Sequence, residues 1–105
     1  MINLETKGFE LLSEQTKEEF GKIWEEYSKK IERKLKGAET CRIHLKEYSP
    51  GGRVKFSIHI LLTFSGKSLE ADAVDWELGK TCKKAFVKIE EQAEHIFHVS
   101  DQNKR

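Results

Sequence analysis

The chain has 105 residues, of which 37% are hydrophobic and 35% charged, and its formal net charge at pH 7 is +1. This length suits one domain whose core needs neither a disulfide nor a metal for stability. The near-neutral balance excludes a globally basic nucleic-acid-binding protein, so any attraction to phosphate must come from the local arrangement of charges.

The first half of the chain predicts a short strand followed by a long amphipathic helix. Residues 2–10 can form the strand. Thr16 and Glu19 have the spacing of a capping box, which predicts a helix that begins at Thr16. Gly37 is placed to end this helix after about five turns. The predicted core stripe recurs at three- and four-residue steps through Phe20, Ile23, Trp24, Tyr27, Ile31 and Leu35.

Three strands are predicted next, because apolar and polar residues alternate along them. They occupy residues 41–46, 54–64 and 69–73. Short turns join them at 49–52 and 65–67, which indicates an antiparallel meander.

A second helix is predicted after Asp75, which is a favourable N-cap residue. Its apolar stripe consists of Leu78, Cys82, Ala85, Phe86, Ile89, Ala93 and Ile96. The resulting order, strand, helix, three strands and helix, predicts an α+β two-layer sandwich with both helices on one face of a four-stranded sheet. We expect a single domain over residues 1–99 and a flexible tail over residues 100–105.

The charges of the second helix run against its dipole. In KTCKKAFVKIEEQAE, beginning at Lys80, four lysines come first and three glutamates follow. A helix favours acids near its N-terminus and bases near its C-terminus, and each misplaced charge forgoes roughly 0.3–1 kcal/mol. The lysines therefore call for another explanation.

Placed on a helical projection, basic residues gather on the outward faces of both helices. On the first helix they are Lys22, Lys29, Arg33 and Lys36, and on the second Lys80, Lys83, Lys84 and Lys88. If both helices cover the same side of the sheet, the two groups share one surface. Phosphate backbones are the common partner for such a surface, although a solvated charged face or an acidic protein partner stays an alternative.

Catalytic and metal sites are not indicated. His44, His59, His95 and His98 are not accompanied by Cys or carboxylate residues at the spacing of a metal site, and the last two suit a helix C-terminus. Cys41 and Cys82 fall on core faces and are expected to be buried, reduced thiols. We expect no enzymatic activity, no cofactor and no small-molecule substrate.

Three aromatic residues deserve separate interpretation. Trp24 and Tyr27 lie on the core stripe of the first helix and are predicted to be core residues. Trp76 precedes the second helix and is either a hydrophobic lid or a stacking platform for a base, with the lid favoured.

Two segments stand out beside the order of the elements. The first is LETKGFELL at residues 4–12. The second lies in the predicted second helix and combines an acidic–apolar start at residues 77–78, the small residues Thr81 and Ala85, and KIEEQ at residues 88–92. These segments are similar to the first strand and the last helix of the ribosome hibernation-promoting factor and ribosome-associated inhibitor family, and together with the order of elements they resemble its short form.

The resemblance implies a double-stranded-RNA-binding-domain-like fold and a cytoplasmic factor. It also implies binding to rRNA of the small ribosomal subunit, where the body of the protein would block tRNA and mRNA without any chemistry. Lys7 and Lys88 match basic positions of the family, whereas the other basic positions come from the helical projection alone. A monomer is favoured, and no membrane partner is expected because no apolar run approaches the roughly 20 residues of a transmembrane helix.

Two alternatives remain at this point. The same fold can serve as a module that binds double-stranded RNA away from the ribosome. It can also serve as a protein-interaction scaffold whose contact is the outer face of the sheet, at His59, Leu61 and Thr63.

Overall fold

The computed structural model describes the backbone of residues 2–103 and the side chains of that range other than Pro50 and residues 97–103. In chain order the helices and strands are β1 (Asn3–Lys7), the 3-10 helix η1 (Phe9–Leu11), α1 (Glu14–Lys34), β2 (Ala38–Tyr48), the 3-10 helix η2 (Pro50–Gly52), β3 (Lys55–Phe64), β4 (Lys67–Asp75) and α2 (Leu78–Asn103). The predicted strand, helix, three-strand and helix order is confirmed.

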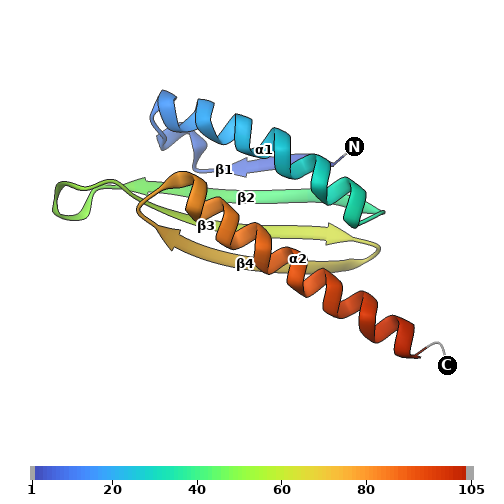
Figure 1. The fold of residues 1–105 in the computed structure, drawn as a ribbon. Helices are drawn as coiled ribbons and strands as arrows, with labels where there is room; N and C mark the ends of the chain where they lie inside the picture. The colour runs from blue at the N-terminus through green and yellow to red at the C-terminus, as the bar shows by residue number, and fades with distance from the viewer. Residues whose placement is uncertain (1, 104–105) are drawn as a thin grey trace.

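The strands form one mixed sheet in the order β1-β2-β3-β4. Strand β1 pairs in parallel with β2, because α1 carries the chain back across the sheet between them. Short turns make β2, β3 and β4 antiparallel neighbours. Figure 1 shows both helices on one face of this sheet, with the C-terminal part of α2 extending past the strands. The predicted two-layer α+β arrangement is therefore confirmed.

The core lies between the helices and one face of the sheet. The strand residues on that face include Cys41, Ile43, Leu45, Ile58, Ile60 and Leu62, all at most 1% exposed. From the helices, Phe86 is also buried, and its ring stacks on Tyr27 at a centroid distance of 4.5 Å. Trp24 lies 6.3 Å from the same ring, so both aromatic residues of α1 pack against the core as predicted.

The start of α1 corrects one prediction. Ser13, not Thr16, is the N-cap, and its Oγ accepts a hydrogen bond from the Thr16 backbone N–H at 3.2 Å. Glu47 of β2 in turn accepts a bond from the Ser13 backbone N–H at 3.0 Å. The tertiary contact with β2 therefore places the helix start three residues before the position that the local spacing indicated.

The end of α2 corrects another. The helix continues to Asn103, so His95 lies within it and not in its last turn. His98 belongs to the residues whose side chains are not described. The backbone of residues 100–103 is helical, and residues 104–105 lie outside the described part. Helical geometry does not measure mobility, so the flexible tail over residues 100–105 stays a prediction. Within the described residues, neither helix has the length and apolar character needed to cross a bilayer.

Candidate nucleic-acid interface

The outer face of α1 carries a row of exposed cations. Buried Phe20, Ile31 and Leu35 fix the opposite side of the helix against the core. The outward side forms a shallow hollow of about 410 Å³ lined by Lys22, Glu25, Glu26, Lys29, Lys30 and Arg33. Four bases therefore face two acids on this surface, which leaves it locally positive although the whole chain is nearly neutral.

Most of these bases are not neutralised by the protein itself. Lys30 pairs with Glu26 at 3.6 Å, whereas Arg33 donates through Nε to the Lys29 backbone carbonyl at 3.4 Å. Among the side chains that the structure describes, no ion pair forms at Lys22 or Lys29. Lys36 lies just beyond the end of α1, is exposed, and likewise forms no described ion pair. The predicted residues of α1 are thus brought together and left available.

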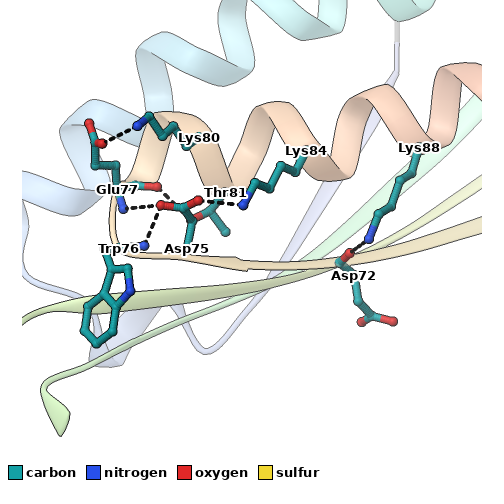
Figure 2. A network of polar contacts seen from close by, with 8 residues as sticks. All are labelled: Asp72, Asp75, Trp76, Glu77, Lys80, Thr81, Lys84 and Lys88. Atoms are coloured by element: carbon teal, nitrogen blue, oxygen red, sulfur yellow. Dashed lines mark hydrogen bonds and ion pairs between the residues drawn. The ribbon is translucent and has the colours of Figure 1, made fainter.

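The lysines of α2 behave differently, and Figure 2 shows why. Lys84 Nζ lies 2.6 Å from Asp75 Oδ2, and Lys80 Nζ lies 2.9 Å from Glu77 Oε2. Both acids stand at the residues immediately before the helix. The negative charge that α2 lacks in its own first turn is therefore supplied by the segment that leads into it, which explains part of the reversed charge order.

Asp75, the last residue of β4, links this strand to α2. Its carboxylate accepts bonds from the backbone N–H groups of Trp76, at 2.6 Å, and Glu77, at 3.2 Å, as well as from Lys84. The hydrogen bond from Lys84 holds the pKa of Asp75 below its usual value, and the two backbone bonds add to this effect. The predicted N-cap role is corrected in detail, because Asp75 binds the two residues before the helix and not the first helical turn.

Lys88 has an intramolecular partner as well. Its Nζ donates to the backbone carbonyl of Asp72 at 2.6 Å (Figure 2), and one turn further Gln92 Nε2 donates to that of Glu70 at 2.6 Å. Both carbonyls belong to β4, which is an edge strand. Side chains of α2 therefore satisfy acceptor groups that the sheet leaves unpaired along this edge.

The remaining predicted positions divide between the two faces. Lys83 is exposed on α2 and forms no ion pair among the described residues. The two helical groups lie on the same side of the sheet, joined by an ion pair of 3.2 Å between Lys34 Nζ and Glu90 Oε2. Lys7 is separate, because its register partner is His44 on the face of the sheet that no helix covers. The sequence had placed Lys7 on the first strand but did not indicate which face of the sheet it occupies.

Sequence reasoning missed two further cations, Arg53 and Lys55. Arg53 Cζ lies 4.5 Å from the centroid of the Trp76 ring, and Lys55 Nζ lies 4.9 Å from it. The indole is 39% exposed and lies under these cations, so the favoured interpretation of Trp76 as a lid over the core is wrong. The sequence did contain a pattern that could have identified Lys55. Apolar and polar residues alternate over residues 55–63, which places Lys55 on the face of the sheet opposite the core.

The cysteines are confined to the interior. Cys41 and Cys82 are free and fully buried, as predicted, and burial raises the pKa of each thiol to about 12. Neither therefore offers a thiolate for nucleophilic or redox chemistry near neutral pH. Among the described residues, no group of three or more His, Cys, Asp and Glu side chains gathers in a way that could hold a metal ion.

Comparison with known proteins places the fold. No protein-family model and no curated protein sequence matches the chain. A solved structure of a ribosomal subunit interface protein from Coxiella burnetii matches with a TM-score of 0.58 over 92% of this chain and 97% of that one, at 14% sequence identity. The chain therefore shares the fold of that ribosomal subunit interface protein over nearly its whole length.

Proposed function

We propose that this protein is a ribosome-associated factor of the hibernation-promoting and ribosome-associated inhibitor type. It binds rRNA of the small ribosomal subunit through the outward faces of α1 and α2 and acts in the cytoplasm. Its body occupies space that tRNA and mRNA need, so it silences or preserves idle ribosomes by steric exclusion.

The observation that carries this proposal is a set of α1 cations that form no ion pair among the described residues, within a fold shared with a ribosomal subunit interface protein. Lys22, Lys29 and Arg33 follow one side of the helix at helical spacing and face solvent. Rigid helices present such charges at fixed spacings, which suits the regular phosphates of folded RNA. Lys83 is exposed on α2, and Lys36 is exposed just after the end of α1.

The lysines of α2 that already have partners within the protein have a different role in the proposed RNA binding. Lys80, Lys84 and Lys88 each have an acceptor within 2.9 Å, so RNA contact by them requires exchange of that acceptor for a phosphate. We assign primary contact to the unpaired cations of α1 and Lys83. The paired lysines of α2, together with Lys7, are assigned a secondary part.

Sucrose-gradient co-sedimentation with ribosomal subunits and whole ribosomes tests the proposal. At low salt the protein is expected to migrate with the small subunit, and at high salt to be released. The reason is that binding to phosphates releases counterions from the RNA, and a high salt concentration disfavours that release. Failure to migrate with any ribosomal particle at low salt contradicts the proposal. Equal binding to a plain RNA duplex supports instead a double-stranded-RNA-binding module of the same fold.

Two single charge reversals sharpen the test. Lys29→Glu places a negative charge in the centre of the α1 row, whereas Lys67→Glu makes the same change of net charge at the exposed start of β4. Co-sedimentation should weaken markedly for Lys29→Glu and little for Lys67→Glu. Equal weakening by both variants would mean that net charge, and not this surface, controls binding.

A further inference from the structure

The uncovered face of the sheet carries a second concentration of basic and aromatic side chains, at the end where β2 and β3 meet. Tyr48 is the register partner of Lys55, and Lys46 is that of Ser57. Continuing the β3–β4 register by one residue from Phe56 and Asp75 places Lys55 beside Trp76. We call the group Lys46, Tyr48, Arg53, Lys55 and Trp76 the hairpin-end patch.

Two aromatic rings of this patch face solvent. Tyr48 is 42% exposed and Trp76 is 39% exposed. Figure 2 shows the indole of Trp76 on the opposite side of the β4 ribbon from Lys80 and Lys84, so it belongs to the uncovered face and not to the helical face. Lys55 lies between the two rings in the register and has its ammonium group 4.9 Å from the indole centroid.

The charged side chains of the patch are all basic. Lys46, Arg53 and Lys55 carry the charges, and the patch contains no acid. Elsewhere on the same face, Glu5 pairs with Arg42 at 3.0 Å, and Asp72 lies 2.6 Å from His59 Nδ1. Glu70, the register partner of Leu61, is a further exposed acid of this face and lies farther along β4 from the patch.

The neighbouring His44 is consistent with a positive local potential. Loss of water contact lowers the pKa of His44, and the charges of Lys46, Lys7 and His59 lower it further, against a smaller opposing effect of Glu10. The imidazole therefore stays neutral near pH 7 and leaves the charge of this region to the lysines and Arg53.

We propose that the hairpin-end patch binds single-stranded nucleic acid, by stacking bases on Trp76 and Tyr48 and pairing phosphates with Lys46, Arg53 and Lys55. Aromatic rings exposed on a sheet stack any base, and nearby cations follow the backbone of the strand. A base that enters over the indole displaces the Arg53 guanidinium, which then becomes available to a phosphate. Folded RNA and a single strand would thus bind opposite faces of the molecule.

This inference is independent of the proposed function, because it uses neither helix. The partner is a single strand and not a duplex, since exposed rings need unpaired bases to stack on. A protein partner is the alternative occupant, because Val54 and Val74 are exposed nearby, and it predicts that the patch does not bind an oligonucleotide.

Quenching of tryptophan fluorescence by an oligouridylate of about eight nucleotides tests the proposal, since single-strand binding sites span roughly 4–16 nucleotides. The Trp24→Phe background isolates the signal of Trp76. We expect saturable quenching for the parent. Variants that replace Trp76 have no tryptophan in this background, so their affinity is measured by the fluorescence anisotropy of a dye-labelled oligouridylate. Binding should be about tenfold weaker for Trp76→Ala and largely retained for Trp76→Phe, which keeps a ring. Leu61→Ala, on the same face but outside the patch, should bind like the parent.

The opposite results overturn the proposal. Absence of quenching, or unchanged affinity in both Trp76→Ala and Tyr48→Ala, shows that the rings do not stack bases. Tighter binding of a duplex than of the single strand excludes a single-strand platform. If Trp76→Ala does not fold, as judged by circular dichroism, Trp76→Phe combined with Lys55→Glu provides the test, and unchanged binding there is equally negative. Lys29→Glu should leave oligouridylate binding unchanged, so failure here is distinct from failure of ribosome binding.

Discussion

At the scale of single residues, Asp75 shows how one carboxylate resolves the reversed charges of α2. It lies before the helix, where sequence spacing suggested an N-cap, and it binds Lys84 and two backbone N–H groups. The residue type was informative because Asp commonly accepts bonds from nearby backbone N–H groups. The pairing with Lys84, nine residues later, depends on how the chain turns from β4 into α2, and local sequence patterns do not encode that turn.

This arrangement predicts a pH-dependent stability. Because the folded pKa of Asp75 is depressed, mainly by Lys84, its contribution is present above the unfolded pKa of about 3.9 and is lost as the pH falls through the folded pKa. Asp75→Asn should therefore unfold at a lower temperature than the parent at pH 7. The difference should disappear in strongly acidic solution, as measured by thermal unfolding across the acid range.

A matched substitution controls for the loss of any carboxylate. Glu91→Gln removes an exposed carboxylate from α2 and should leave the unfolding temperature nearly unchanged at every pH. A pH-independent difference between Asp75→Asn and the parent would show that the charge of Asp75 does not stabilise the fold.

At the scale of elements, the two edges of the sheet and the two helices have unequal roles. The edge strand β4 is covered by Lys88 and Gln92 of α2, which bind the carbonyls of Asp72 and Glu70. Lysines at sheet edges also discourage pairing with another chain. By contrast, α1 presents cations that no described ion pair neutralises, at Lys22 and Lys29. Helical periodicity identified both groups but did not distinguish them, because the distinction depends on which strand lies beneath each helix.

Removing the edge cover should weaken the fold slightly and promote association. Lys88→Ala with Gln92→Ala loses two exposed hydrogen bonds, for which we expect about 1 kcal/mol or less of unfolding free energy in urea. Sedimentation velocity should show increased self-association through the free β4 edge. Lys83→Ala provides the control, since Lys83 forms no described hydrogen bond, and it should change neither quantity. A double variant that matches Lys83→Ala in both measurements would contradict the edge role.

At the scale of the whole molecule, a nearly neutral chain separates its charges into distinct surfaces. The helical side carries the α1 cations and Lys83, and the uncovered sheet face carries the hairpin-end patch. Electrostatic binding of RNA depends on such local surfaces and not on net charge. Composition alone therefore gave no indication of these surfaces, whereas helical projection indicated one of the two for which nucleic-acid binding is proposed.

Salt dependence measures how many of the helical cations act. If the unpaired group of Lys22, Lys29, Arg33, Lys36 and Lys83 neutralises five phosphates, the log–log slope of small-subunit affinity against salt should be roughly −4. Lys83→Ala should make the slope shallower by about one unit or less while leaving urea unfolding unchanged. A slope near zero would contradict phosphate binding by this surface.

The sequence by itself determined the element order, the core stripes and the α+β class, because the periods of 3.6 and 2 residues follow directly from helix and strand geometry. It also identified the outward basic residues of each helix. Only the tertiary structure decided that Ser13 caps α1, that Lys84 and Lys88 bind β4, and that Lys7 and Trp76 lie on the uncovered face. Those outcomes depend on contacts between residues far apart in the chain, such as Ser13 with Glu47 and Lys88 with Asp72, and periodicity carries no record of them.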